Sequence, residues 1–381
     1  MRMPYPRIAV IAPGSDTPGG QGVQARALAD ALRGEGAEVQ SIPVDPRFPG
    51  PLLWLRRVPY ARTVLNEALY LVGLRRLRHV DVVHVFAASY WSFLLSPVPA
   101  ILAGRALGKR IVLNYHRGEA ADHLARWGVL VHPWLRLADE IVVPSEFLQR
   151  VFARHGYPAR VIRNIVDTWR FRFRERAPLR PRLVSTRNLE PYYRVEDTLT
   201  AFALLKARYP HATLTVAGYG TEEGRLRRLA SRLDVGGIRF VGRVEPAVMP
   251  DVCDQADIFV NSSVVDNQPL SVLEAFAAGL PVVSTGTGDI AAMVRHGETG
   301  LVVPPRDPPA LARAVTAVLE DPHRARLMAR RAREEVRKYT WGEVRREWAA
   351  VHEAGHRSGR GVQAPRLHAA AAGQETGLPG R

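Results

Sequence analysis

The sequence contains a single cysteine, Cys253, among its 381 residues. One cysteine cannot form a disulfide within the chain, and such a composition fits a reducing compartment. Cys253 stands shortly before the apolar run 258–260, so we interpret it as a core residue. We therefore expect neither a disulfide-stabilised fold nor catalysis by a thiol.

Long hydrophobic runs are also lacking. The longest weakly polar stretch, residues 91–103, contains Pro97 and Pro99 and falls short of the roughly 20 residues that a membrane-spanning helix needs. No secretory signal is recognisable, because residues 8–12 have the pattern of a buried strand directly after a polar start. We therefore expect a cytoplasmic protein.

Lysine occurs only at positions 109, 206 and 338, although Lys and Arg together number 53 and the formal net charge is +16. The excess of arginine has two explanations that the sequence leaves open: codon bias in a GC-rich genome, or an anionic partner such as phosphate, lipid or nucleic acid. No lysine-rich tail, zinc knuckle or aromatic-basic sheet motif is present. The net positive charge is therefore the only feature of the sequence that supports nucleic-acid binding, and it is not sufficient. We expect no nucleic-acid partner.

Short apolar runs, each followed by a helical pattern, dominate the sequence in two series. Val and Ile without polar alternation are typical of strands covered on both faces, so both series predict parallel sheets. The length suits two such α/β domains. The first series comprises residues 8–12, 39–44, 82–86, 111–114, 141–143 and 161–162, and the second comprises 183–185, 214–217, 238–241, 258–260, 282–284 and 301–303.

The two series are separated around residues 167–181, where TWRFRFRERAPLRP carries five arginines and two prolines without a strand period. Residues 356–381 are rich in Gly, Ala and Pro and have no core-forming pattern, which predicts a disordered tail. The expected organisation is an N-terminal lobe over residues 1–168, a linker over 169–181, a C-terminal lobe over 182–338 and a final helix over 339–355.

A glycine-rich loop follows the first predicted strand, where Gly19, Gly20 and Gly22 lead into a helical pattern. Glycine lets the backbone approach a ligand closely, and a helix N-terminus offers N–H groups to a phosphate. The loop is longer than the G-x-G-x-x-G turn of a dehydrogenase. A tight strand-to-helix turn is the alternative explanation. We name the three glycines as candidate ligand-binding residues.

From Asp266 onward the sequence reads DNQPLSVLEAFAAGLPVVSTGTGDI. It resembles the family 4 retaining glycosyltransferases of the GT-B fold, whose signature is a Glu, seven residues, a second Glu and then A-x-A-x-G-x-P-V-V. Glu274 stands in the second Glu position and Asp266 in the first. The resemblance implies that Glu274 binds the donor ribose and that N–H groups near Leu270 and Ser271 face the donor diphosphate. A solvated helix carboxylate is the alternative for Glu274.

Further matches add candidate residues. Arg187 stands where the family has an arginine that clamps the donor diphosphate, and in place of a lysine a few residues on the sequence offers Tyr193 and Arg194. We assign Arg194 to donor binding as well; the alternative is a surface arginine without a functional role. Gly218 matches the family's G-x-G. His116 follows a strand at the end that faces the ligand crevice, where relatives have a histidine beside the donor sugar; a structural histidine is the alternative.

Two departures from the family pattern stand out. Asp266 is shorter than the family's Glu, and Gly288-Asp289 with Ala292 replaces a Gly-Gly followed by a downstream Glu. Both positions belong to the region that the resemblance assigns to the donor sugar. A changed donor pocket is therefore expected.

The resemblance implies an α/β protein of the GT-B class, with two Rossmann-like parallel-sheet lobes facing across a cleft and a C-terminal helix returning to the first lobe. The implied activity is retaining transfer of a sugar from a nucleotide-sugar donor to a hydroxyl of a glycan, a lipid-linked sugar or a small molecule. His116, Asp266 and Arg187 are the implied catalytic residues. No D-x-D motif stands where a metal-dependent enzyme needs one, so we expect no metal and no cofactor. A non-catalytic or epimerase-like protein of the same fold, binding a sugar nucleotide, is the alternative.

The segment 52–80 matches no family motif. It combines Trp54, Tyr60, Tyr70 and several leucines with arginines at positions 56, 57, 62, 75, 76 and 78. Such a mixture can rest on an anionic bilayer surface, which would make the protein peripheral on the inner face of the membrane. A helix packed into the first lobe, with arginines extending outward, is the alternative.

Overall fold

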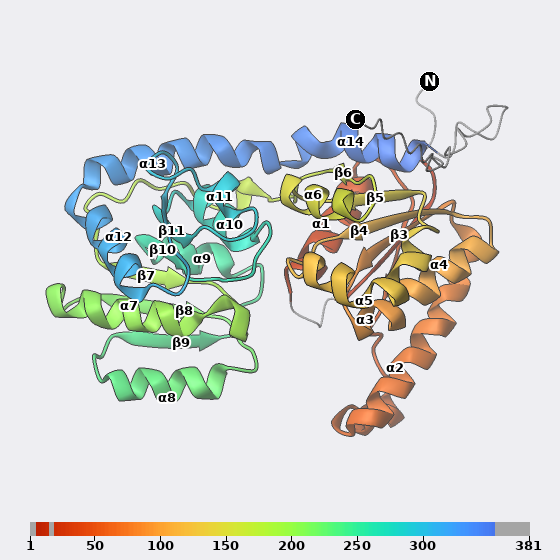
Figure 1. The fold of residues 1–381 in the computed structure, drawn as a ribbon, viewed down its shortest axis with the longest axis horizontal. Coiled ribbons are helices and arrows are strands. Elements are labelled where there is room, and N and C mark those ends of the chain that lie inside the picture. Colours follow the sequence, from red (N-terminus) through yellow and green to blue (C-terminus); the bar gives the residue numbers. More distant parts are fainter. Residues whose placement is uncertain (1–4, 15–18, 355–381) are drawn as a thin grey trace, which may run out of the picture.

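The computed structural model describes residues 5–14 and 19–354, and the tail expected over residues 356–381 lies outside this part of the chain. The described chain forms two lobes that lie next to each other (Figure 1). Each lobe contains one six-stranded sheet, and all strand pairs within both sheets are parallel.

The first sheet has the strand order β2-β1-β3-β4-β5-β6. Because side chains alternate between the faces of a strand, β1 supplies Ala9 and Ile11 to one hydrophobic core and Ile8 and Val10 to another. The sheet is therefore buried on both faces. Its strands are β1 (Ile8–Ala12), β2 (Val39–Pro43), β3 (Val82–Ala87), β4 (Arg110–Tyr115), β5 (Glu140–Val143) and β6 (Arg160–Val161).

The second sheet has the strand order β12-β11-β10-β7-β8-β9. In β10, Ile258 and Val260 enter one core and Phe259 enters the other, so this sheet is also covered on both faces. Its strands are β7 (Arg182–Ser185), β8 (Thr213–Ala217), β9 (Ile238–Gly242), β10 (Ile258–Asn261), β11 (Val282–Thr285) and β12 (Leu301–Val303).

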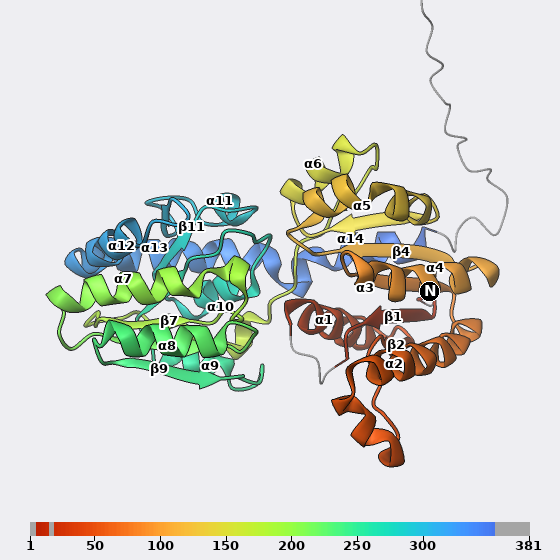
Figure 2. The ribbon, with the colours of Figure 1, turned by 60° about the horizontal axis from the view of Figure 1, so that its bottom comes forward.

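Helices cover the faces of both sheets (Figure 2). The first lobe contains α1 (Gly20–Gly34), α2 (Pro59–Gly73), α3 (Trp91–Leu95), α4 (Pro97–Ala106), α5 (Ala120–Leu135) and α6 (Glu146–Arg154), with 3-10 helices η1 (Gly50–Arg57) and η2 (Leu74–His79) on either side of α2. The second lobe contains α7 (Val195–Arg208), α8 (Glu223–Leu233), α9 (Met249–Asp254), α10 (Leu270–Ala278), α11 (Ile290–Met293), α12 (Pro308–Glu320) and α13 (Pro322–Glu335). Short 3-10 helices complete it: η3 (Thr168–Arg170), η4 (Pro191–Tyr193) and η5 (Val336–Tyr339).

The chain crosses between the lobes twice. After β6 it passes to the second lobe, where the buried Arg176 donates to the carbonyl oxygens of Cys253 and Ala256 at 3.1 and 3.3 Å. The last helix, α14 (Trp341–Glu353), follows α13 and η5 and runs back along the first lobe (Figure 1). There Val344 and Trp348 are part of the first-lobe core.

These findings confirm the expected fold class, two Rossmann-like lobes with parallel sheets and a C-terminal helix that returns to the first lobe. Each apolar run named from the sequence overlaps a strand. The exact domain boundaries stay a prediction. Among the described residues, no helix is both long and apolar enough to cross a membrane.

Candidate functional site

A cavity of about 300 Å³ lies between the lobes and is lined by residues of both. This volume is at the lower end of the range found for small-molecule sites. The lining comes from loops that follow β1, β4, β7, β8 and β10 and from the start of α10. All of these strands are parallel to their neighbours, so their carboxyl ends meet at the ligand-binding edge of a sheet.

Two helices begin at this cavity. The N-cap residues of α1 and α10 are Gly19 and Pro269, and neither helix has a side-chain cap. A Cβ atom on Gly20 would lie 3.9 Å from Leu270 Cδ1, so the two helix starts are in contact where they line the cavity. The N–H groups of a first helical turn have no partner within the helix and carry the positive end of its dipole. This part of the cavity can therefore bind an anion, and phosphate is the usual one.

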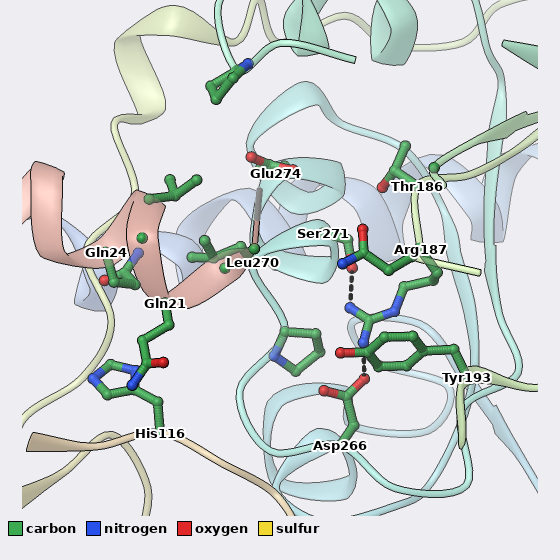
Figure 3. A pocket seen from close by; sticks show the side chains of 18 of the residues that line it. Gln21, Gln24, His116, Thr186, Arg187, Tyr193, Asp266, Leu270, Ser271 and Glu274 are labelled. Carbon is green, nitrogen blue, oxygen red and sulfur yellow. Dashed lines mark hydrogen bonds and ion pairs between the residues drawn. The ribbon is translucent and has the colours of Figure 1, made fainter. Parts of the chain in front are cut away.

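Arg187 is fixed by three neighbours on the second-lobe side of the cavity. Its Nη1 donates to Ser271 Oγ at 2.9 Å and its Nη2 to an Asp266 oxygen at 2.6 Å. The guanidinium carbon lies 4.0 Å from the centre of the Tyr193 ring, an attractive cation–π arrangement. Figure 3 shows Arg187 between Ser271 and Asp266. The Nε of Arg187 is buried without a described partner.

The loop that carries Asp266 is tied to the first lobe by buried hydrogen bonds. Asn267 Oδ1 accepts from Ser145 Oγ at 2.5 Å. Gln268 accepts from the backbone N–H of Asn164 at 2.7 Å and donates to the carbonyl oxygen of Pro144 at 2.7 Å. These bonds set the position of one lobe against the other at the cavity.

Glu274 lies in α10 and lines the cavity. Burial raises the pKa of its carboxyl to about 7, and the positive charges of Arg170 and Arg187 oppose this rise. The carboxyl group therefore changes charge near neutral pH. When ionised it can accept two hydrogen bonds from a diol.

His116 lines the first-lobe side of the cavity directly after β4. Its ring stands against Phe86 with the ring centres 5.3 Å apart. Burial lowers the pKa of His116 to about 3. The imidazole is therefore neutral at neutral pH, so it can act as a hydrogen-bonding group and not as a cation.

Two glycines are required by close backbone contacts around the site. A Cβ atom on Gly218 would lie 2.0 Å from the carbonyl oxygen of Arg187. A Cβ atom on Gly288, whose φ is +58°, would lie 1.9 Å from the carbonyl oxygen of Asp266. Any larger residue would displace the segment that carries Arg187 or the one that carries Asp266.

The structure brings most of the residues named from the sequence to one cavity, namely Gly19, Gly20, Gly22, His116, Arg187, Gly218, Asp266, Leu270, Ser271 and Glu274. Arg194 is the exception and does not line it in the part of the chain that the structure describes. Arg194 pairs with Asp197 at 2.8 Å and with Glu196 at 3.0 Å. The assignment of Arg194 to the donor stays a prediction; in this structure the arginine pairs with two acidic residues at the start of α7.

Sequence reasoning missed several cavity residues. Tyr193 was noted only as a replacement for lysine, whereas its ring supports Arg187. Arg117 and Gln268 also line the cavity, and neither was given a role from the sequence, although Gln268 belongs to the stretch that begins at Asp266. The described residues contain no group of three or more His, Cys, Asp or Glu placed to hold a metal ion.

Two Rossmann-like lobes with an anion-binding cavity between them define a protein of the GT-B class. Residues 18–170 match the family described as "Glycosyltransferase Family 4" and residues 180–321 match "Glycosyl transferases group 1". The chain is 31% identical over 353 residues to glycogen synthase of Mycobacterium tuberculosis, covering 87% of this chain and 84% of that protein. It belongs to the family 4, group 1 glycosyltransferases, and it is an enzyme that uses a nucleotide-sugar donor.

Other relatives agree with this assignment. Phosphatidyl-myo-inositol mannosyltransferase of Mycolicibacterium smegmatis is 26% identical over 381 residues, covering 94% of this chain and 96% of that protein. Sucrose-phosphate synthase from Thermosynechococcus elongatus is similar in fold, with a TM-score of 0.77 and 21% identity over 93% of this chain and 100% of that one. Anabaena HepE in complex with UDP-glucose has a TM-score of 0.71 and 16% identity, covering 93% of this chain and 100% of that one.

Proposed function

We propose that this glycosyltransferase retains the anomeric configuration of the sugar it transfers and requires no metal ion. The observation that carries the proposal is the convergence of Arg187 and the starts of α1 and α10 on one anion-binding region. Glu274 stands within the same cavity, where its carboxylate can accept hydrogen bonds from the ribose of the donor.

In the proposed reaction the acceptor hydroxyl attacks the anomeric carbon from the face on which the diphosphate leaves. The bond between that carbon and the diphosphate oxygen breaks, the bond to the acceptor oxygen forms, and the diphosphate takes the acceptor's proton. Negative charge grows on the leaving group as its bond breaks. Arg187 and the N–H groups of Leu270 and Ser271 are arranged to stabilise that charge.

His116 has a separate part in this proposal. Its imidazole stays neutral because burial lowers its pKa to about 3. A neutral ring can donate to or accept from a sugar hydroxyl without adding a charge beside the reacting carbon. Asp266 orients Arg187 through their ion pair and stands with it beside the sugar and its phosphate.

The test is an assay of purified enzyme with a panel of nucleotide sugars, in which release of nucleoside diphosphate and the anomeric configuration of the product are measured. We expect a product with the configuration of the donor and unchanged turnover after treatment with EDTA. A product of inverted configuration would contradict retention. Activity that collapses with EDTA and returns with Mg²⁺ or Mn²⁺ would contradict metal independence. Binding of a sugar nucleotide without any transfer would favour a non-catalytic or epimerase-like role.

The acceptor in this proposal is lipid-linked and is met at the anionic inner face of the membrane. The segment 52–80 supports this, because η1 and most of α2 extend away from the first lobe (Figures 1 and 2). Trp54 is 62% exposed, Tyr60 88% and Val64 71%. At the other end of the segment, Tyr70 is buried in the first-lobe core. Thus the end of the segment near Tyr70 packs against the first lobe, and the end near Trp54 presents apolar side chains to solvent.

Charge and relatives support the same acceptor. The arginines at positions 57, 62, 75, 76 and 78 are all exposed, and each basic residue near an anionic surface contributes about 1 kcal/mol of attraction. One of the relatives with the greatest coverage is a phosphatidyl-myo-inositol mannosyltransferase, which by its name acts on a lipid.

A further inference from the structure

Positive charge at the anion-binding end of the cavity is partly cancelled within the protein. Arg187 stands 2.6 Å from Asp266, and their side chains are 8% and 9% exposed. Two opposite charges this close act on a bound phosphate largely as a dipole, so they attract it less than a lone arginine would. A donor diphosphate carries more than one negative charge. Arg187 alone therefore leaves much of that charge without a compensating cation.

Most other basic groups of the cavity are also engaged. Arginines supply all the basic side chains that line it, apart from His116. Arg243 pairs with Glu245 at 3.0 Å. The Arg170 guanidinium donates to the carbonyl oxygen of Pro246, and its positive charge acts on Glu274. The side chains of Arg26 and Arg117 have neither an ion pair nor a hydrogen bond within the described chain. These two are the candidates for an additional cation.

The position of Arg117 is set by its neighbour. It belongs to the loop between β4 and α5 in the first lobe and is exposed. A Cβ atom on Gly118 would lie 3.1 Å from the carbonyl carbon and the carbonyl oxygen of Asp266. Gly118 therefore touches the backbone of the residue whose carboxylate holds Arg187. Because adjacent Cα atoms are about 3.8 Å apart, Arg117 starts beside this contact between the lobes.

The positive charge of Arg117 acts on the part of the cavity that Tyr192 and Tyr193 line. Burial raises the pKa of the Tyr192 hydroxyl, and the positive charge of Arg117 opposes this rise more than any other charge does. Tyr192 precedes Tyr193, whose ring supports Arg187. Arg26, in contrast, lies in the second turn of α1 and also lines a separate hollow between α1 and β2.

We propose that Arg117, on the first lobe, binds the donor diphosphate and supplies across the cleft the positive charge that Asp266 withdraws from Arg187. This inference rests on the proposed function, because it assumes a nucleotide-sugar donor with its diphosphate at Arg187. The diphosphate is then shared between the lobes, whereas the nucleoside is held by the second lobe. Arg117 touches the leaving group and so belongs to the catalytic residues.

The test compares ligands that differ only in phosphate. Isothermal calorimetry measures binding of uridine, UMP and UDP, and of the guanosine and adenosine counterparts, to the wild type and to Arg117→Ala, Arg117→Gln and Arg117→Lys. For the base that the wild type prefers, we expect Arg117→Ala and Arg117→Gln to weaken diphosphate binding roughly 10- to 100-fold, the range of a hydrogen bond to a charged group. Nucleoside binding should change less than about twofold, because no phosphate is involved.

Two comparisons separate charge from structure. Arg117→Lys keeps the positive charge and is expected to retain most of the diphosphate affinity. Arg154→Ala removes an arginine of α6 that is exposed and does not line the cavity, and it should bind every ligand as the wild type does. Turnover should follow the same order, with Arg117→Ala slowest.

Unchanged diphosphate binding and turnover in Arg117→Ala, in a protein whose Arg187→Ala variant loses both, would overturn the role of Arg117 and leave the donor site standing. Equal loss of nucleoside and diphosphate binding would also overturn it. A wild type that binds no nucleoside diphosphate at all would instead refute the proposed function on which the inference rests.

Discussion

Arg187 and Asp266 form a buried ion pair with 2.6 Å between the guanidinium and the carboxylate. They are 79 residues apart in the chain and follow different strands, β7 and β10. Ser271 and Tyr193 complete the surroundings of the guanidinium. Arg187 is therefore oriented before a donor arrives, and such preorganisation is what makes a charged group effective on a leaving group.

Replacing Arg187 with alanine should slow turnover about 10²- to 10³-fold, the usual cost of losing one group that stabilises developing charge. Binding of the nucleoside alone should hardly change. The measurements are kcat with the preferred donor and calorimetric affinities for the nucleoside and its diphosphate. Equal weakening of both affinities would show that Arg187 does not act on phosphate.

This variant needs a control for folding, because it leaves Asp266 buried without its partner, at a cost of roughly 3–5 kcal/mol. The double variant Arg187→Ala/Asp266→Ala removes both charges and should recover part of the lost thermal stability. It should not recover turnover. Recovery of turnover in the double variant would mean that the single variant was inactive through misfolding.

Glu274 gives the enzyme a pH dependence of donor binding. Burial raises the pKa of its carboxyl to about 7, and the ionised form accepts hydrogen bonds from the two ribose hydroxyls more strongly than the neutral form does. Donor affinity should therefore increase as the pH rises from 6 to 8, and Glu274→Gln should remove this dependence. Glu274→Ala should lose roughly 1.5–3 kcal/mol of donor affinity. Calorimetry across that pH range checks both points, and wild-type affinity in the alanine variant would refute the ribose contact.

The strands could be predicted from local patterns in the sequence, and the resemblance to a known family named most of the residues that line the cavity. Uninterrupted Val and Ile runs indicate buried parallel strands wherever they occur. Glu274, Leu270 and Ser271 were assigned through the resemblance to the family, and they line the cavity together because they lie on one helix. The direction of the Arg194 side chain could not be predicted, because it depends on a left-handed backbone, with φ of 48°, and on the pairing with Asp197.

Contacts between distant segments could not be predicted in this way. Gly118 meets Asp266 only once the two lobes are placed against each other. Asn164 donates two hydrogen bonds to Gln268 between the lobes, and neither residue has a neighbour in sequence that indicates the other. Without such contacts Arg117 is one arginine among many in a basic chain.

The docking of α14 onto the first lobe should depend on pH through a buried histidine pair. His84 Nδ1 and His352 Nε2 are 3.0 Å apart, and the side-chain amide of Asn114 contacts the other nitrogen of His84 at 3.1 Å. Burial lowers the pKa of His84 well below 6.5 and that of His352 to about 3. Nearby Arg110 lowers the pKa of His352 further.

Because the folded-state pKa values are lowered, the unfolded chain takes up protons first when the pH falls below about 6.5. The stability that the neutral pair contributes is therefore present above that pH and is lost as the pH falls toward the folded-state values. Urea unfolding at pH 7 and pH 5 measures the difference. His352→Gln should reduce this pH dependence, whereas a change at the exposed His79 should not. An equal pH dependence in both variants would contradict the assignment.

The last prediction concerns the segment 52–80 and the acceptor. Reversing Arg57, Arg62, Arg75 and Arg76 to glutamate should release the protein from vesicles that contain anionic lipid, since each arginine contributes about 1 kcal/mol of attraction near such a surface.

A matched control reverses four exposed arginines of the second lobe, at positions 228, 232, 313 and 331, and changes the net charge by the same amount. Sedimentation with vesicles of anionic and of neutral lipid, at low and high salt, measures binding. Hydrolysis of the donor in the absence of acceptor should be the same in both variants, because neither set lines the cavity between the lobes. If the wild type does not bind anionic vesicles, or if the two sets of reversals weaken binding equally, the segment is not a membrane-docking surface. The acceptor is then to be sought among soluble molecules.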